Sequence, residues 1–273
     1  MIGGDLLDNG DVRLAPFWHL IASASGPCPD EARLFGRAIP TATGSVTRHL
    51  GLWWFAPAAP VAPLPEVPED DDEHFVRVPS EPWSWRTDAG RMADNFCDLG
   101  HLPFVHATSF ADPADQLIGH LDVRRNSTGF DVIHDHVTKR LRDAGTGARR
   151  MVLRFVTPFS VILRLEYPEE DTIITTGFLH QPVAPGQTIL WAINWRDDII
   201  DGRCSAVETT AFQELVGAED RVVFERITPT GLPLDVTAEV HTRADAPTLA
   251  IRRVLADLLG PPPGPPVGDR RFG

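Results

Sequence analysis

The stretch DNFCDLGHLPFVH, residues 94–106, places several chemically capable side chains close together. It contains the amide of Asn95, the carboxylate of Asp98 and the imidazoles of His101 and His106. Two histidines at this spacing can converge on one ion, and one further carboxylate would complete the two-histidine, one-carboxylate face that leaves positions open on Fe(II). The same spacing also fits two ordinary histidines at a helix end. A metal site and a structural role therefore both stay open on these residues alone.

Asp220 is the carboxylate whose setting in the sequence is unusual. A helix is predicted over residues 204–227, and Asp220 falls in the middle of its apolar stripe. That stripe is expected to consist of Phe212, Val216, Val223 and Ile227. A carboxylate on an apolar helix face is costly unless it is paired, protonated or bound to a metal. Asp220 is therefore expected either to accept a buried hydrogen bond or to bind an ion.

The elements that would position the first segment are a helix and the turn that follows it. Apolar residues after Asp88 repeat at intervals of three and four, which predicts a helix with Asp88 or Thr87 as its N-cap. Pro103 is expected to end this helix, because a proline disfavours helical geometry in the residue before it. The amide, the carboxylate and the first histidine would then share one stripe, and His106 would lie in the turn beyond.

The middle of the chain, from about residue 120 to residue 198, changes to a period of two and to β-forming residues. This pattern predicts antiparallel strands joined by turns such as DAGTG and APGQ. His134 and His136 would point to the same side of one of these strands. That spacing could chelate an ion, and it equally suits polar residues that line a cavity or face water.

The two ends of the chain differ from this middle part. Residues 1–60 read as short strands cut by glycine and proline, and residues 56–74 form a proline-rich and then acidic connector. Residues 261–273 are rich in proline and glycine and are expected to be disordered or polyproline-like. The predicted units are therefore residues 1–74, residues 75–260 and the tail 261–273.

The composition limits the partners of the protein. The 273 residues include 25 basic and 38 acidic side chains, and the formal charge of -13 argues against binding to nucleic acid or to an anionic membrane. No run of about 18 apolar residues is present. Three scattered cysteines suggest neither a disulfide framework nor a zinc knuckle, and Cys97 has an acidic neighbour that disfavours a thiolate. These features predict a soluble, cytoplasmic protein.

The motif N-x-x-D-x-x-H-x-x-x-x-H, followed by GAEDRVVFERI on the late helix, resembles a known family. It is similar to the catalytic domain of the α subunit of Rieske non-haem iron oxygenases, in the vanillate demethylase-like branch. The stretch TTGFLHQPVAPGQTILWAINWRDD resembles the central hairpin of that domain, and the likeness covers roughly residues 80–230. The resemblance implies an α+β helix-grip fold of the START/Bet v1 type, with a curved antiparallel sheet over a long helix and a pocket between them.

The resemblance also implies roles for the residues that match the motif. His101, His106 and Asp220 would be the ligands of a mononuclear Fe(II). Asn95 and Asp98 would be the further catalytic residues, Asn95 as a near-ligand and Asp98 as the acid that links the iron to the cluster of a neighbouring subunit. A homo-oligomer, a trimer in the family, is implied as well.

The sequence departs from the family at the cluster. A Rieske [2Fe-2S] cluster needs Cys-x-His and Cys-x-x-His, because one iron takes two thiolates and the other takes two imidazoles. Neither pair occurs in the sequence. Yet APFWHLIASASGPCPDEARLFGRAIP resembles the beginning of the Rieske domain, and HLGLWWFAP resembles its end. We therefore interpret residues 1–74 as a degenerate β remnant and expect no [2Fe-2S] cluster.

Three classes of function are compatible with these patterns. The first is an iron oxygenase or oxidase acting on a small, largely apolar substrate, with electrons from the substrate or from an external ferredoxin. The second is a redox-neutral cyclase or isomerase of natural-product biosynthesis, which would use positioning and acid-base chemistry in the same pocket, with or without metal. The third is a binding subunit without catalysis. The complete set of candidate ligands disfavours the third class and favours the first.

Overall fold

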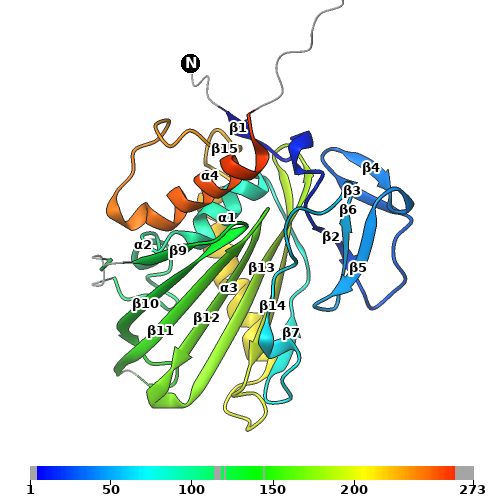
Figure 1. Ribbon diagram of the computed structural model, residues 1–273. Coiled ribbons are helices and arrows are strands. Elements are labelled where there is room, and N and C mark those ends of the chain that lie inside the picture. The colour runs from blue at the N-terminus through cyan, green and yellow to red at the C-terminus, as the bar shows by residue number, and fades with distance from the viewer. Residues whose placement is uncertain (1–4, 114–117, 120, 144, 262–273) are drawn as a thin grey trace, which may run out of the picture.

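The computed structural model describes residues 5–113, 118–119, 121–143 and 145–261. It is a mixed α/β structure, in which one large antiparallel sheet is accompanied by helices and by a smaller N-terminal β unit (Figure 1). Of the predicted tail, only residue 261 lies within the described residues. No helix in the described ranges has the length and hydropathy needed to cross a lipid bilayer.

The helices are α1 (Ala89–Cys97), α2 (Leu102–Val105), α3 (Ala206–Phe224) and α4 (Ala246–Leu259). The strands before the first helix are β1 (Leu6–Leu7), β2 (His19–Ser23), β3 (Glu31–Leu34), β4 (Arg37–Pro40), β5 (Ser45–His49), β6 (Leu52–Ala56), β7 (Val76–Pro79) and β8 (Trp83–Trp85). The later strands are β9 (Asp122–Arg125), β10 (Gly129–Lys139), β11 (Thr146–Val156), β12 (Ser160–Tyr167), β13 (Thr172–Ala184), β14 (Gln187–Arg196) and β15 (Leu232–Pro233).

The large sheet has the order β7-β14-β13-β12-β11-β10-β9, with β8 also paired to β14. All of its neighbouring strands are antiparallel. The six strands predicted between residues 120 and 198 are all present, and they occupy adjacent positions in this sheet. The predicted APGQ turn joins β13 to β14, where Gly186 supplies the positive φ of 68° that the turn requires.

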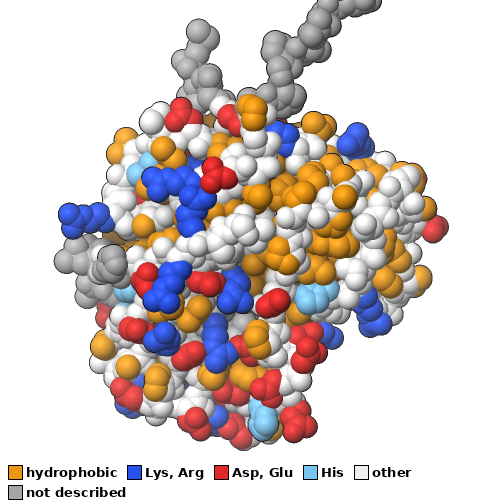
Figure 2. Space-filling model, viewed as in Figure 1, with side chains coloured by type: hydrophobic (Ala, Val, Ile, Leu, Met, Phe, Trp, Pro, Cys, Tyr) orange, Lys and Arg blue, Asp and Glu red, His pale blue; other side chains and the backbone are white. Residues whose placement is uncertain are grey.

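The two faces of the sheet have different neighbours because successive side chains point to opposite sides. On one face Phe130, Leu153 and Val161 belong to the same core as buried residues of α1 and α4. The opposite face carries cross-strand ion pairs such as Arg154–Asp131 on β11 and β10. Figure 2 shows acidic and basic side chains mixed over this sheet face, beside an apolar region toward the N-terminal unit. The apolar face of the sheet is therefore the one that the helices cover.

The N-terminal unit contains the three-stranded sheet β2-β6-β5 and the hairpin β3-β4. It lies against the large sheet on the side of β14 (Figure 1). Leu20 and Trp54 of this unit share a buried cluster with Leu179 and Trp195 of β13 and β14. Its core is thus continuous with that of the large sheet.

The start of α1 is held by a residue far away in the sequence. Asp88 occupies the predicted N-cap position, but its side chain makes no capping bond within the helix. Its Oδ1 instead accepts hydrogen bonds from the backbone N–H groups of Asn9 (2.8 Å) and Gly186 (2.9 Å). The amide oxygen of Asn9 accepts from the Ala89 N–H at 2.8 Å. The fully buried Asn9 therefore caps α1 and ties the N-terminal segment to the helix that precedes the site.

The chain between the two histidines folds differently from the sequence-based expectation. Pro103 was predicted to end the first helix, but α1 already ends at Cys97, and Asp98 is its C-cap. Pro103 lies instead in the first turn of α2, where the missing N–H is tolerated. His101 and His106 are the N-cap and C-cap of this short helix. The expected stripe through His101 on the first helix is therefore wrong.

The orientation of α3 also differs in part from the prediction. Its buried residues are Thr209, Gln213, Gly217, Asp220 and Phe224, whereas the predicted stripe residues Phe212 and Val223 are 45% and 39% exposed. Asp220 does lie on the buried face, as predicted. The face is set by the close approach to β8 at Gly217, where a Cβ would come 2.9 Å from Cη2 of Trp83 and closer still to Cζ3. Packing against this tryptophan overrides the apolar periodicity.

Candidate metal centre

The side chains of His101, His106 and Asp220 converge in the structure. The two Nε2 atoms of the histidines lie 3.3 Å apart. Oδ1 of Asp220 lies 3.2 Å from Nε2 of His106 and 3.6 Å from Nε2 of His101. Three potential ligand atoms from two separate segments thus form one compact triangle.

The triangle has the dimensions that a facial ligand set requires. Ligands at about 2.1 Å from an ion, with angles of 90° between them, are about 3.0 Å apart. The observed separations of 3.2, 3.3 and 3.6 Å are slightly longer than this value, and they are short enough for all three atoms to hold one ion. A set of two histidines and one carboxylate would leave an Fe(II) ion free to bind further ligands.

The environment of the triangle also fits a bound cation. The side chains of His106 and Asp220 are 2% and 3% exposed. Oδ1 of Asp220 makes no hydrogen bond with any of the described residues, although it lies close to both imidazoles. A buried carboxylate oxygen without a donor is costly. A divalent ion at the centre of the triangle would compensate this oxygen and use the lone pairs of both ring nitrogens.

Glu219 completes the surroundings of His106, and the sequence analysis missed it. Its Oε2 lies 2.8 Å from Nδ1 of His106, the nitrogen that faces away from the triangle. Thr108 and Ser109 also donate their hydroxyl groups to this carboxylate. Metal-bound imidazoles commonly make such a contact through their second nitrogen. Glu219 directly precedes Asp220 in GAEDRVV, but the sequence does not indicate that it contacts His106.

The electrostatics of His106 reflect its acidic neighbours. Burial disfavours the imidazolium, but Asp220 and Glu219 outweigh this effect, so the pKa of His106 is raised. Burial alone would raise the pKa of the Glu219 carboxyl group. The hydrogen bonds from His106, Ser109 and Thr108 have the larger effect, so this pKa is lowered. The site is thus an anionic pocket around two imidazoles, which suits a cation.

Asn95 and Asp98 lie beside the triangle and do not belong to it. Nδ2 of Asn95 is 3.5 Å from Nε2 of His101. Oδ2 of Asp98 is 3.7 Å from Nδ1 of His101, while its Oδ1 accepts a hydrogen bond of 2.7 Å from the backbone of Gly100. The separation of Asp98 from His101 is longer than a hydrogen bond. Asp98 therefore approaches the outer nitrogen of His101 less closely than Glu219 approaches that of His106.

The triangle opens into a cavity between the helices and the sheet. Besides the three candidate ligands and Asp98, the cavity is lined by apolar side chains and Arg149. The apolar residues are Phe96, Leu99, Leu102, Phe110, Met151, Leu153, Leu163, Leu165, Phe178 and Val216. Phe96 and Phe178 are stacked with their ring centroids 4.3 Å apart. Such a lining suits a small, largely apolar molecule.

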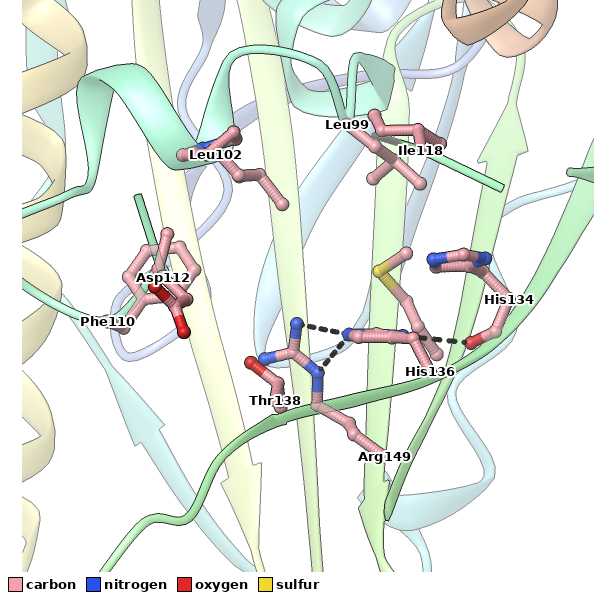
Figure 3. Close-up of a pocket in the computed structure, with 12 residues that line it drawn as sticks. Leu99, Leu102, Phe110, Asp112, Ile118, His134, His136, Thr138 and Arg149 are labelled. Carbon is pink, nitrogen blue, oxygen red and sulfur yellow. Dashed lines mark hydrogen bonds between the residues drawn. The ribbon is translucent and has the colours of Figure 1, made fainter. Parts of the chain in front are cut away.

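His134 and His136 line a second, adjoining cavity, shown in Figure 3. Their rings are stacked, with centroids 4.6 Å apart. Nε2 of His136 accepts hydrogen bonds from Arg149, and burial together with Arg149 and His134 lowers the pKa of His136 to about 4. A ring nitrogen that accepts from an arginine has no lone pair left for a metal. Of the two alternatives for this pair, the cavity-lining role fits the geometry.

Cys97 lies near the site in sequence but is inaccessible. It is fully buried in α1, and burial together with Asp94 and Asp98 raises the pKa of its thiol well above the ordinary value. The side chain therefore remains a thiol and packs as part of the core.

Comparison with known proteins supports a family relationship. Residues 85–260 match the family described as vanillate O-demethylase oxygenase C-terminal domain. The chain is 28% identical over 184 residues to the probable methylxanthine N7-demethylase NdmC of Pseudomonas sp. (strain TJI-51), covering 61% of this chain and 60% of that protein. It is 24% identical over 195 residues to the methylxanthine N1-demethylase NdmA of Pseudomonas putida, covering 71% of this chain and 54% of that protein.

Solved structures share the fold over a larger part of the chain. The structure of Pseudomonas putida CBB5 NdmA with caffeine superposes with a TM-score of 0.70 at 17% identity, covering 90% of this chain and 91% of that one. The structure of dicamba monooxygenase bound to dicamba superposes with a TM-score of 0.68 at 14% identity, covering 90% of this chain and 97% of that one. At these identities the likeness concerns the fold alone. The aligned sequence, in turn, spans only part of the length of the two demethylases.

Proposed function

The chain belongs to the family of vanillate O-demethylase oxygenase C-terminal domains, the catalytic domain of Rieske-type oxygenases, and we propose that it is a mononuclear non-haem iron oxygenase acting on a small, largely apolar molecule. His101, His106 and Asp220 would bind the Fe(II). The observation that carries the proposal is the triangle of their ligand atoms, with sides of 3.2, 3.3 and 3.6 Å. The two demethylases to which the sequence is similar support the same class of chemistry.

The residues around the metal centre would have distinct roles in this reaction. His101, His106 and Asp220 would hold the Fe(II), which would supply the capacity to bind and reduce dioxygen. Glu219 would accept a hydrogen bond from the Nδ1–H of His106, which fixes the tautomer and turns the Nε2 lone pair toward the ion. Asp98, whose Oδ2 lies 3.7 Å from Nδ1 of His101, would act on that ring through its charge and not through a hydrogen bond. The apolar walls hold the substrate beside the ligand triangle and keep bulk water out.

The supply of electrons is the second part of the proposal. Reduction of dioxygen to water takes four electrons, and an oxidative demethylation draws two of them from the substrate. The sequence contains neither cysteine-histidine pair of a Rieske cluster. We propose that residues 1–74 are a degenerate Rieske remnant without a [2Fe-2S] cluster. An external ferredoxin-type donor would then deliver the other two electrons, or the substrate would provide all four.

Three further assignments belong to this proposal. The sheet and α3 would form a helix-grip domain over residues 75–260, followed by the tail. The protein would act in the cytoplasm. It would assemble as a homotrimer, in line with the family resemblance of its motif.

Metal analysis of variants tests the ligand assignment. His106→Ala and Asp220→Ala are expected to lose stoichiometric Fe(II) binding, because each removes one corner of the triangle. Glu214→Ala is the matched control, since Glu214 lies on the same helix but is exposed. Iron content after anaerobic loading, measured by plasma mass spectrometry, reports the result. Retention of iron by Asp220→Ala at the level of the control would contradict the assignment.

A second experiment separates oxygenase chemistry from the redox-neutral alternative. The His106–Glu219 pair is an acid-base arrangement that could also serve a cyclase or isomerase. Candidate substrates are therefore incubated with Fe(II)-loaded protein in air and with chelated protein under nitrogen. Turnover that requires both iron and dioxygen supports the proposal. Turnover by the metal-free protein under nitrogen, at near the full rate, would favour the alternative.

A further inference from the structure

The outer face of α3 carries a stripe of apolar side chains. In the view of Figure 1 this helix lies behind the large sheet. Residues three and four positions apart share one face of a helix, and the exposed residues of α3 at these spacings are Val207, Ala211, Leu215, Ala218 and Val222. The valines and the leucine of this outer stripe are 79%, 56% and 51% exposed. The outer stripe runs from the second residue of α3 almost to its end.

The outer stripe reverses the usual pattern of a surface helix. Such a helix turns its polar residues to solvent and its apolar residues to the core. The helix α4 follows this rule, since its exposed residues are Arg253 and Asp257. The buried face of α3, in contrast, includes Thr209, Gln213 and Asp220, while the outer stripe faces solvent. A contiguous apolar surface of this kind marks a contact with another molecule.

The sizes of the stripe residues make two copies of α3 complementary to each other. From Ala211 to Val222 small and large side chains alternate, and their spacing is that of the a and d positions of a coiled coil. When two copies of α3 run antiparallel with Leu215 opposite Ala218, the same register places Val222 opposite Ala211. Each large side chain then fills the space beside a small one, as close helix packing requires.

The same register pairs the charges beside the outer stripe. Glu214 and Arg221 are exposed and lie on one flank of the stripe, two helical turns apart. In the antiparallel pair, Glu214 of each copy would lie beside Arg221 of the other, so this attraction would occur twice. The register also brings Glu225 opposite Glu208, but Glu225 already forms an ion pair with Arg86 within the chain.

A parallel pair of the same helices would be less favourable. It would place Leu215 against its own copy and Ala218 against its own copy, which crowds one layer and leaves a gap in the next. Glu214 would then face a second Glu214. The two helix dipoles would also point the same way, whereas the antiparallel pair opposes them. Size, charge and dipole therefore favour the antiparallel arrangement.

We propose that the outer stripe of α3 is a self-association surface, on which the α3 helices of two copies of this chain pack antiparallel about a twofold axis. Asp220 lies on the opposite, buried face of the helix, so the contact is independent of the proposed function. A twofold contact of this kind doubles whatever unit carries it, which means a dimer from single chains or a hexamer from trimers. Because one helix forms most of the contact, the area stays below the standard of about 800 Å² per partner, and association should depend on concentration.

Sedimentation velocity of the full chain over a range of concentrations tests the contact. The wild type should reach twice the mass of Leu215→Glu, because the introduced carboxylate would be buried against apolar residues of the second copy. Val137→Glu is the matched control, since Val137 is 64% exposed but lies on β10, and it should associate like the wild type. Circular dichroism checks that each variant is folded.

Charge reversal tests the register. Glu214→Arg alone, or Arg221→Glu alone, would place like charges opposite each other and should weaken association by about tenfold. The double variant restores opposite charges across the contact and should associate more tightly than either single variant. This comparison also decides the matter if Leu215→Glu fails to fold.

Three results would overturn the inference. The first is an equal mass of wild type and Leu215→Glu at every concentration. The second is a double charge reversal that associates no better than the single ones. The third is a trimer that Leu215→Glu breaks into single chains, because the outer stripe would then belong to a threefold contact.

Discussion

At the scale of single residues, the candidate ligands could be found in the sequence and their supporting contacts could not. His101 and His106 are close together in the chain, and Asp220 is conspicuous as a charged residue within an apolar pattern. The contact between Glu219 and His106 joins segments more than a hundred residues apart. No local pattern specifies which carboxylate reaches which ring nitrogen, so this partner was identified only from the fold.

Glu219 provides a prediction at this scale. Glu219→Gln should weaken Fe(II) binding by about 10- to 100-fold, because the neutral amide no longer fixes the tautomer and charge of His106. Asp98→Asn should have a smaller effect, since Oδ2 of Asp98 is 3.7 Å from the ring of His101. Competition with a chelator of known affinity measures both variants. Equal losses in the two variants would show that the closer contact has no special role.

At the scale of elements, the strands, the start of α1 and the extent of α3 were predictable, and the end of α1 was not. Alternating side chains located all six strands from β9 to β14, because the sheet has one helix-covered face and one charged face. The break between α1 and α2 was misplaced, since Pro103 was read as a helix end and is a helix start. The helix α4, whose Arg252 forms a buried ion pair with Asp94 on α1, was not anticipated.

The prediction at this scale concerns the effect of Gly217 on metal binding and stability. It lies one turn before Asp220, and only a residue without a side chain allows α3 to pack so closely on Trp83. Gly217→Ala should displace α3 outward, weaken Fe(II) binding by about tenfold and lower stability by about 1–3 kcal/mol from overpacking. Chelator competition and urea unfolding measure the two effects.

A compensating variant is the control for this experiment. Trp83→Leu removes the ring that the new methyl group would meet, so the double variant should recover part of the loss in metal affinity. Strictly additive effects of the two substitutions would indicate that the close approach does not position Asp220.

At the scale of the whole molecule, two buried histidines link folding to pH. Burial lowers the pKa of His19 in the N-terminal unit to about 4, and it lowers the pKa of His180 on β13 to about 4 as well. In the unfolded chain both should titrate near 6.5. Between these values the unfolded state binds more protons, so stability should fall as the pH drops from about 6.5 toward 4.

The size of this effect can be measured in a variant. Each histidine should contribute a slope of at most about 1.4 kcal/mol per pH unit. His19→Gln should therefore show a shallower decrease in unfolding free energy between pH 7 and pH 5 than the wild type, measured in urea. His74→Gln is the contrasting variant: the hydrogen bond to Asp72 raises the pKa of this exposed histidine, so its removal should make the decrease no shallower than in the wild type. Parallel slopes in wild type and His19→Gln would contradict the prediction.

The division of the candidate ligands between two segments has a consequence for the folding of the molecule. His101 and His106 lie at the two ends of one short helix, whereas Asp220 follows more than a hundred residues later on α3. An ion bound to all three would act as a reversible cross-link that closes this long loop. Unlike a disulfide, such an ion would bind only the folded state, because unfolding separates the three ligands, and its binding energy would add to the stability of the fold. Bound iron would thus hold α2 and α3 together as well as serve the chemistry. The supply of iron would then influence how long the protein stays folded.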